Sequence, residues 1–384
     1  MSKKVMFLAH EGVGLGHIAR TCKIANHLSE KNMCLVVTGS REAAWLLKRS
    51  VDFVKLPSLD GLITERARYL GTKLYFDRGD EKAIRFRKTL AEETARHFAP
   101  DIIFIDHTFT GKGGEYKDLL LRSGSEIFIV LRPVLGTREE SVRHIFGNLG
   151  ADLIPVLQPK VLVAGDARTS TSSDDVRSFF PTIPIEHVGY LAGPGERTNP
   201  SARPYNILCS SGSGFDGEVL SYAMCELAEK QPDISITLIV GPRGSNPPAA
   251  PPNVEVILET HSIHQQLERA QLVVCHGGYN SVIEAMSHHL PIVVFLGDGV
   301  DPIARDERRI HSRLLSSHYP LLVCEDVKEL PQAIHSSREL PAADTYPNAL
   351  VVNGLANIGN LVATASPAKA SDFVVTPIDR TGDG

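Results

Sequence analysis

The sequence lacks several features that would assign it to common classes of protein. None of its apolar runs approaches the ~18 residues that a membrane-spanning helix needs. The apolar run of residues 5–9 is too short for a signal peptide and continues into a glycine turn, so we expect a cytoplasmic protein. The six cysteines include no C-x-x-C pair and several lie inside apolar runs, which predicts reduced, buried thiols.

A strong excess of charge of one sign is also absent. The formal net charge is −5, and lysine and arginine are scattered rather than clustered. This gives no indication of a nucleic-acid partner or of stable membrane insertion. Apolar residues make up 42% and charged residues 22% of the chain, which are ordinary values for a soluble globular enzyme. At roughly 150 residues per domain, the length allows about two or three domains.

Strand and helix patterns alternate along most of the chain. Short β-branched runs such as PDIIFID and EIFIVLR carry no polar alternation, which is typical of strands buried on both faces of a parallel sheet. The alternation stops in a segment rich in glycine and proline and then resumes, and each half opens with a strand and a glycine-rich turn. The sequence therefore predicts two tandem, doubly wound α/β domains of the Rossmann type with a cleft between them.

The same pattern gives the expected domain boundaries. The first domain would span residues 1–192, a linker 193–204 and the second domain 205–342. A helix within residues 343–365 could cross back onto the first domain. The tail at residues 366–384 has turn residues without periodicity, so we expect it to be loosely ordered.

The first glycine turn, EGVGLGHIAR, follows a strand as phosphate-binding turns do. Its glycines Gly12, Gly14 and Gly16 are spaced G-x-G-x-G, the next strand ends without an acid, and no G-K-[ST] occurs. Neither a nicotinamide site nor a P-loop is therefore expected. His17 would lie in the first turn of the next helix, whose dipole disfavours the cation. A neutral imidazole there could accept a proton from a hydroxyl, or it could only cap the helix or touch a phosphate.

Two further glycine motifs lie in the second half of the chain. CSSGSGF follows a strand, and its N–H groups could form an anion site or only a tight turn. In VVCHGGYNSVIEAM a strand ends at Cys275, and His276 could donate a hydrogen bond to a phosphate oxygen. Gly277 and Gly278 would let a ligand approach the backbone closely.

Alternatives remain open in the helices that follow. The helix after the H-G-G motif would start at Asn280 or Ser281, and its free N–H groups favour a diphosphate. Glu284 could hold two ribose hydroxyls, or it could close a capping box with Ser281. The acids of the later segment DPIARDERRIHSR could bind sugar hydroxyls or only start a solvated helix.

Together these motifs resemble a known family. HGGYNSVIEAMSHHLPIVVFL is similar to the nucleotide-sugar signature of GT-B glycosyltransferases of the family 1 and family 28 types, which include antibiotic and plant enzymes and the GlcNAc transferase of peptidoglycan synthesis. GLGHIAR resembles their N-terminal glycine loop, and SSGSG lies where they carry a diphosphate loop. PDIIFIDHTFTGKGGEYKDLL and IFIVLRPV resemble a group of bacterial predicted glycosyltransferases. The resemblance covers about residues 3–365 in order.

The resemblance implies an acceptor site on the first domain and a donor site on the second. His17 would be the general base and Asp106 its orienting acid, with His107 as a competing polar neighbour. Glu284 would bind the ribose, and Glu307, also on the donor side, would match the acid of the family's [DE]-Q-x-x-N-A segment. Thr260 and residues 261–263 would border the base of the nucleotide. The other implied donor-binding residues are Gly14, Gly16, Ser211, Gly212, Ser213, Gly214, His261, Ser262, Ile263, His276, Gly277, Gly278, Asn280 and Ser281.

Departures from the family pattern bear on the reaction. Arg308 stands where glutamine is usual, and His311 and Ser312 where asparagine and alanine are usual, so the donor sugar stays open. Retaining enzymes carry a glutamate where this chain has His276, which favours inversion at the sugar. No D-x-D motif and no His/Cys ligand cluster occur, so we expect no metal and no cofactor. Helix N-termini would stabilise the leaving diphosphate instead.

The predicted function is metal-independent, inverting transfer of a sugar from a nucleotide diphosphate sugar to a hydroxyl of a small molecule. UDP is the favoured nucleotide, and an antibiotic or another natural product is the suggested acceptor. One alternative on the same fold is a nucleotide-sugar hydrolase or 2-epimerase. A second is a catalytically degenerate protein that binds a nucleotide sugar or a partner. The oligomeric state is not predicted.

Overall fold

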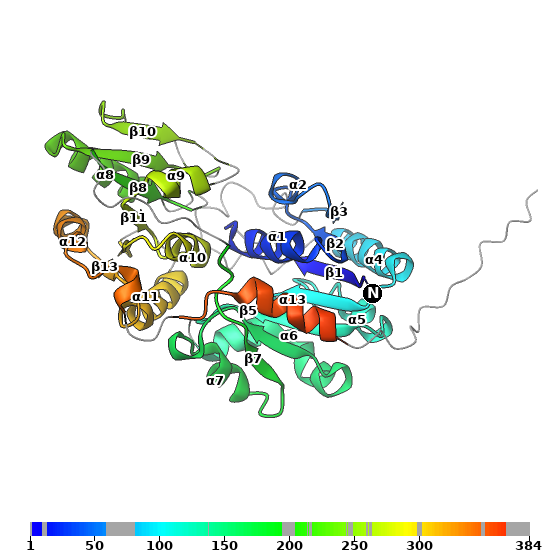
Figure 1. The fold of residues 1–384 in the computed structure, drawn as a ribbon. Coiled ribbons are helices and arrows are strands. Elements are labelled where there is room, and N and C mark those ends of the chain that lie inside the picture. Colours follow the sequence, from blue (N-terminus) through cyan, green and yellow to red (C-terminus); the bar gives the residue numbers. More distant parts are fainter. Residues whose placement is uncertain are drawn as a thin grey trace, which may run out of the picture.

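The computed structural model describes residues 2–9, 14–58, 81–136, 138–193, 204–212, 214, 217–242, 244, 249–258, 260, 263–297, 302–346 and 350–365. Within them the chain forms two parallel β-sheets whose strands alternate with helices (Figure 1). The predicted α/β class with two Rossmann-like units is confirmed. Residues 366–384, the expected tail, lie outside the described residues.

The first sheet has the strand order β3-β2-β1-β4-β5-β6-β7 within the described residues. Its strands are β1 (Lys4–Ala9), β2 (Met33–Thr38), β3 (Asp52–Lys55), β4 (Ile102–Asp106), β5 (Glu126–Leu131), β6 (Lys160–Val163) and β7 (Ile185–His187). The helices between them are α1 (Gly16–Leu28), α2 (Ala43–Leu46), α4 (Glu81–Phe98), α5 (Lys117–Arg122), α6 (Arg138–Leu157) and α7 (Ser172–Arg177), with a 3-10 turn η3 (Ala167–Thr169).

The second sheet has the order β10-β9-β8-β11-β12-β13. Its strands are β8 (Tyr205–Ser210), β9 (Ile234–Ile239), β10 (Val254–Ile257), β11 (Leu272–Cys275), β12 (Ile292–Phe295) and β13 (Leu321–Cys324). The helices are α8 (Glu218–Lys230), α9 (His264–Arg269), α10 (Tyr279–Ser287), α11 (Pro302–Ser316) and α12 (Leu330–Ser337), with 3-10 turns η4 (Val327–Glu329) and η5 (Ala343–Thr345). A last helix, α13 (Gly354–Thr364), follows them in the chain.

Apolar side chains cover both faces of each sheet. On β1, Met6 and Leu8 belong to one hydrophobic cluster, whereas Val5 and Phe7 belong to another on the opposite face. Successive residues of a strand point to opposite faces, so a strand that is covered by helices on both sides must be apolar at every position. This is why the central strands carry no polar alternation in the sequence. All six cysteines are buried, and none forms a disulfide.

Both sheets reverse their strand order beside their first strand. β1 pairs in parallel with both β2 and β4, and β8 pairs in parallel with both β9 and β11. The connections on the two sides of such a strand run in opposite directions, which leaves a crevice at the carboxyl ends where ligands bind. The loops that follow β1, β4, β8 and β11 are therefore the expected positions of site residues.

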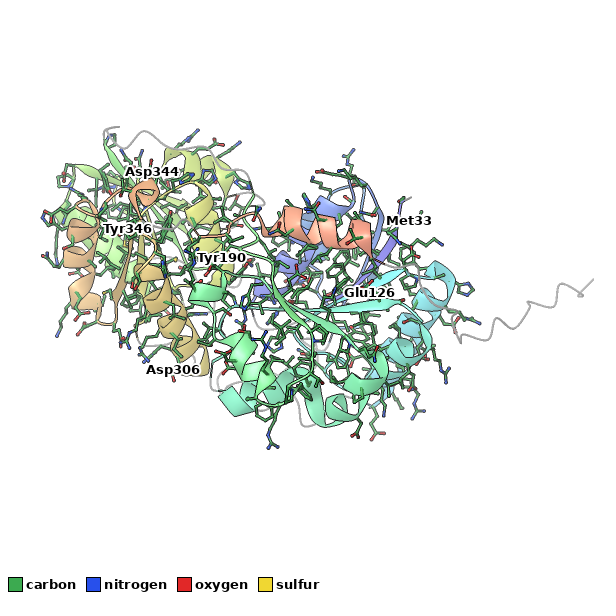
Figure 2. The ribbon with its side chains drawn as sticks, turned by 60° about the horizontal axis from the view of Figure 1, so that its bottom comes forward. Met33, Glu126, Tyr190, Asp306, Asp344 and Tyr346 are labelled. Atoms are coloured by element: carbon green, nitrogen blue, oxygen red, sulfur yellow. The ribbon has the colours of Figure 1, made fainter. Side chains whose placement is uncertain are left out.

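The chain crosses between the two sheets twice, and the crossings lie side by side. Tyr190 N–H donates to Val351 O at 2.7 Å, and Gly354 N–H donates to Tyr190 O at 3.0 Å. Figure 2 shows Tyr190 where the two halves of the molecule meet. After the second crossing, α13 packs against the first unit, where Ile358 and Val362 join the same core cluster as residues of α1 (Figure 1). Within the described residues, no helix combines the length and the apolar character that crossing a bilayer requires.

Candidate active site

A cavity of about 500 Å³ lies between the two units and is lined by residues of both. From the first unit it takes the start of α1, part of α2 and Arg132. From the second it takes the loop after β8, the start of α10 and part of α11. The predicted site residues that line it are Gly14, Gly16, His17, Ser211, Gly212, Ile263, His276, Gly278, Asn280, Ser281, Glu284 and Glu307.

His17, the second residue of α1, lines this cavity and is held by Asp106 at the end of β4. Its Nδ1 lies 2.9 Å from Asp106 Oδ2, and since a carboxylate can only accept, Nδ1 carries the proton of the neutral ring. Arg20, one helical turn further along α1, donates its Nε to Asp106 Oδ1 at 2.9 Å. Both carboxylate oxygens are therefore engaged, and Nε2 is the nitrogen of His17 that can accept a proton.

The charge states of this group follow from burial and pairing. Burial is the largest effect on His17 and lowers its pKa to about 4, although Asp106 opposes the shift. Burial alone would raise the pKa of Asp106, but the charges and hydrogen bonds of Arg20 and His17 hold that pKa below its ordinary value. At neutral pH a neutral imidazole is therefore backed by a charged carboxylate, which is the arrangement of a general base with an orienting acid.

His107, the other polar neighbour that the sequence offered, contacts His17 in a different way. The two rings meet edge to face with centroids 4.7 Å apart and planes at 84°. His107 adopts a left-handed backbone with φ of 69°, which turns the chain directly after Asp106. Nδ1 of His17 therefore donates its 2.9 Å hydrogen bond to the last residue of β4, Asp106, and His107 packs beside the ring.

Two predicted donor-site glycines do not line the cavity. Gly214 has a φ of 88°, and a Cβ there would lie 2.4 Å from the Val240 carbonyl oxygen. Gly277 has a φ of 70°, and its Cβ would lie 2.7 Å from Val294 Cγ1. In both places glycine is required by a left-handed backbone and by close packing against the next strand, so their role is to shape the loops.

The start of α10 differs from both alternatives of the sequence analysis. The helix begins at Tyr279, with Gly278 as its N-cap in an extended conformation and no side-chain cap. Ser281 is therefore already inside the helix, and the capping box with Glu284 does not form. The Glu284 Oε1 instead lies 3.3 Å from Lys23 Nζ of α1, so this carboxylate bridges the two units at the edge of the cavity.

His276 is buried at the end of β11 with a defined tautomer. Its Nδ1 lies 3.0 Å from the Phe295 carbonyl oxygen, which can only accept, so Nδ1 carries the proton of the neutral ring. Nε2 has no hydrogen-bond partner among the described residues. The pKa of His276 is lowered to about 4, mainly by burial and next by the nearby positive charge of Arg308. In the neutral ring Nε2 of His276 can therefore only accept a hydrogen bond. The predicted donation to a phosphate oxygen requires the protonated ring, the imidazolium.

On α11, Glu307 faces the first unit across the cavity. Its Oε1 lies 2.7 Å from Arg132 Nη1, just beyond the end of β5. Burial raises the pKa of Glu307, and the charge of Arg132 opposes that shift. The next residue, Arg308, also lines the cavity. Glu307 is therefore placed beside the first-unit residues rather than exposed at the start of a helix.

The lining residues that the sequence analysis did not assign to the site include Arg20, Arg132 and Tyr279. The Leu191 N–H donates to the Tyr279 hydroxyl at 3.2 Å, and the Arg20 guanidinium carbon lies 5.8 Å from the centre of the Tyr279 ring. The position of Arg20, three residues after His17 on one helix face, was a usable signal. Arg132 directly follows a buried strand, a position at which polar residues reach the carboxyl edge of the sheet.

Some predicted positions cannot be placed. Ser213, His261 and Ser262 lie outside the described residues, whereas Thr260 and Ile263 line the cavity. In the part of the chain that the structure describes, no group of three or more His, Cys, Asp or Glu residues is arranged to hold a metal ion.

The fold is shared with solved GT-B glycosyltransferases. The glycotransferase of kitacinnamycin superposes with a TM-score of 0.62 at 14% identity, covering 94% of this chain and 95% of that one. SnogD, the glycosyltransferase from Streptomyces nogalater, gives 0.58 at 17% identity over 95% and 100% of the two chains. MurG from Acinetobacter baumannii gives 0.57 at 15% identity over 94% and 99%. At sequence identities this low, the structural likeness shows a shared fold and nothing finer.

The sequence match that accompanies this fold lies in the second unit. Residues 218–302 match the model of the glycosyltransferase family 28 C-terminal domain, and they include the H-G-G motif and α10. No curated protein matches the sequence. The family match and the shared fold together support a glycosyltransferase enzyme, and the recognition made from the sequence motifs is confirmed.

Proposed function

We propose that this glycosyltransferase is inverting and metal-independent, and that it transfers a sugar from a nucleotide diphosphate sugar to a hydroxyl of a small acceptor. The observation that supports it best is the placement of His17. The imidazole, with Asp106 behind it at 2.9 Å, lines the same cavity as the loop after β8 and the start of α10. A base from one unit and phosphate-binding loops from the other therefore face one space.

The proposed reaction is a single displacement. The acceptor oxygen forms a bond to the anomeric carbon while the bond from that carbon to the diphosphate oxygen breaks, and the bonding pair leaves with the diphosphate. The hydroxyl proton passes to Nε2 of His17. Asp106 keeps the proton of the neutral ring on Nδ1 and stabilises the imidazolium that forms.

The leaving diphosphate would be stabilised by the second unit. The first turn of α10 has backbone N–H groups without intrahelical acceptors, and Gly278 as the N-cap leaves no side chain in front of them. Ser211 contributes a buried hydroxyl that has no partner among the described residues. These donors would take the place of a metal ion in neutralising the leaving group.

For the substrates, we propose UDP as the nucleotide and a natural product as the acceptor, handled in the cytoplasm. The kitacinnamycin and calicheamicin enzymes among the similar structures are named for such compounds, which favours a small acceptor. Glu284 of α10 and Glu307 of α11, which both line the cavity, are proposed to bind ribose and sugar hydroxyls.

The test is a thermal-shift panel of UDP, dTDP, GDP and CMP with their sugar conjugates, followed by intact-mass detection of donor turnover. One nucleotide class should raise the unfolding temperature, and its sugar conjugate should be consumed only when an acceptor is added. Consumption without an acceptor would make the protein a hydrolase. If no nucleotide raises the unfolding temperature, the proposal is wrong.

A further inference from the structure

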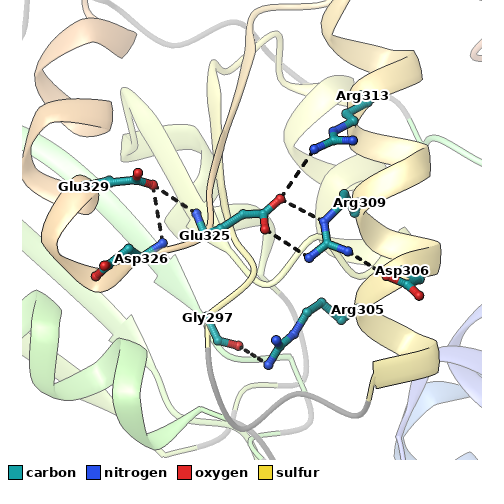
Figure 3. Close-up of polar contacts among 8 residues, drawn as sticks. All are labelled: Gly297, Arg305, Asp306, Arg309, Arg313, Glu325, Asp326 and Glu329. Atoms are coloured by element: carbon teal, nitrogen blue, oxygen red, sulfur yellow. Dashed lines mark hydrogen bonds and ion pairs between the residues drawn. The ribbon is translucent and has the colours of Figure 1, made fainter.

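Helix α11 carries four arginines, and Figure 3 shows the contacts of three of them, Arg305, Arg309 and Arg313. Arg309 donates Nε and Nη2 to the two carboxylate oxygens of Glu325, at 2.8 and 3.0 Å. Arg313 lies 3.6 Å from the same carboxylate, and Arg305 donates to the Gly297 carbonyl oxygen at 3.1 Å. These three side chains are therefore engaged by other residues of the second unit, Glu325 and Gly297.

Arg308 lines the cavity, as does the preceding residue, Glu307. Nη1 of Arg308 is buried without a hydrogen-bond partner, and no carboxylate within the described ranges pairs with it. The other guanidiniums that line the cavity are balanced, Arg20 by Asp106 and Arg132 by Glu307. Glu307, on which the charge of Arg308 also acts, is thus already paired with Arg132, and Arg308 has no ion pair of its own among the described residues.

A guanidinium withdrawn from water without an acceptor is unfavourable, and an oxyanion relieves this best because it can accept two parallel N–H bonds. Arg308 also lies beside the residue that follows His276, since a Cβ on Gly277 would be 3.5 Å from Arg308 Cβ, and both His276 and Arg308 line the cavity. The amide of glutamine, usual at this position in similar enzymes, is neutral and suits hydroxyls. A positive charge here therefore changes the chemical class of ligand that is favoured.

We propose that Arg308 is a specificity residue that binds an oxyanion of the donor. This inference rests on the proposed function. The oxyanion has two possible sources: a carboxylate on the donor sugar, as in a hexuronic acid, or the diphosphate itself. Both present oxygen pairs that match the guanidinium.

The experiment compares the wild-type protein with the R308Q and R309Q variants. Arg309 is the matched control, because it is the next residue on the same helix and its partners are Glu325 and Asp306 at the protein surface. Isothermal titration with UDP, UDP-glucose, UDP-glucuronate and inorganic pyrophosphate gives four dissociation constants for each protein. Loss of a charged hydrogen bond should weaken the affected ligands about 10- to 100-fold.

The pattern of losses identifies the source. Weakening of UDP-glucuronate alone in R308Q supports a sugar carboxylate, whereas equal weakening of all four ligands supports the diphosphate. R309Q should bind all four as the wild type does. The inference is overturned if R308Q binds every ligand as tightly as the wild type, or if R309Q loses as much affinity.

The proposed function can fail separately. If the wild-type protein binds pyrophosphate through Arg308 but neither UDP nor its sugars, the oxyanion site stands and the UDP-sugar proposal is wrong. If the wild type binds none of the four ligands, both are wrong.

Discussion

The two halves of the cavity share one strand-and-turn arrangement, but they differ in whether the polar groups named below are hydrogen-bonded within the protein. In each, a glycine turn follows the first strand of a doubly wound sheet. On the first side, His17, Asp106 and Arg20 are bonded to one another. On the second side, Ser211 Oγ and His276 Nε2 are buried without partners among the described residues.

Under the proposed function, the first side is a preassembled group and the second side is completed by the ligand. A base must be held in one tautomer and one direction before the substrate arrives, so its partners belong to the protein. A binding site keeps donors and acceptors for its ligand, and in the empty protein those groups remain unsatisfied. The comparison predicts that substitutions on the first side change turnover, whereas those on the second side change affinity.

The largest expected effect comes from H17A. Removal of the general base should lower the rate of transfer by about 10²- to 10⁴-fold, while the donor dissociation constant stays within about twofold, because His17 belongs to the preassembled side. Single-turnover mass spectrometry measures the first quantity and isothermal titration the second. H97A, at an exposed histidine of α4, is the control. A loss of donor affinity in H17A as large as the loss of rate would mean that His17 binds the diphosphate and is not the general base.

D106N should give a smaller loss of turnover, about 10²-fold, because the base remains but loses its orientation. Since the base acts in its neutral form, wild-type activity should fall as the pH drops toward the pKa of His17, about 4. Asp106 raises that pKa, so the acidic limb of kcat/KM should move to lower pH in D106N. An acidic limb that stays in place, or moves to higher pH, would contradict the assigned role.

The same variant tests the pairing of the buried charges. Without the carboxylate, Arg20 is left buried and unbalanced, so the free energy of unfolding should drop by about 3–5 kcal/mol. Denaturant titration measures it. D118N, which removes a half-exposed ion pair with Lys88, should cost less than about 1 kcal/mol. Equal losses in the two variants would mean that Asp106 is not the centre of a buried pair.

On the ligand-completed side, H276A should weaken donor binding about 10-fold and change turnover less. Binding of the diphosphate should favour the imidazolium, so that a proton is taken up and wild-type affinity increases from pH 7.5 to pH 5.5. Isothermal titration at the two pH values measures this dependence, which H276A should lose. H335A, at an exposed histidine of α12, is the control. An affinity that is independent of pH in the wild type would refute the role of the imidazolium.

The smallest effect is expected at the contact between the two sides. The Lys23–Glu284 pair is about a quarter exposed, with 23% and 24% of the two side chains accessible, so K23M should change stability by less than about 1 kcal/mol. If Glu284 binds ribose, its release from Lys23 should tighten nucleotide binding by less than about fivefold, and E284A should weaken it. Titration with UDP distinguishes these outcomes, and no change in either variant would remove Glu284 from the donor site.

Much of the fold and part of the site could be predicted from the sequence, because their signals are local. A doubly covered strand such as β4 is apolar at every position, and a glycine turn with His17 directly follows β1. The start of α10 was predicted one or two residues too late, because Gly278 caps the helix without a side chain that would mark it. Gly214 and Gly277 look like ligand-binding glycines in the sequence, although packing against β9 and β12 is what requires them.

The sequence by itself determined the two α/β units, the histidine after each of two strands and the family that the motifs indicate. Only the tertiary structure decided which charges are paired. Arg132 reaches Glu307, and Lys23 reaches Glu284, across the junction of the two units. Partners that are distant in the chain meet where the strands of the two sheets end, and burial there determines whether each group is charged. The same physics leaves Nη1 of Arg308 buried without a hydrogen-bond partner among the described residues, which no local pattern in the sequence records.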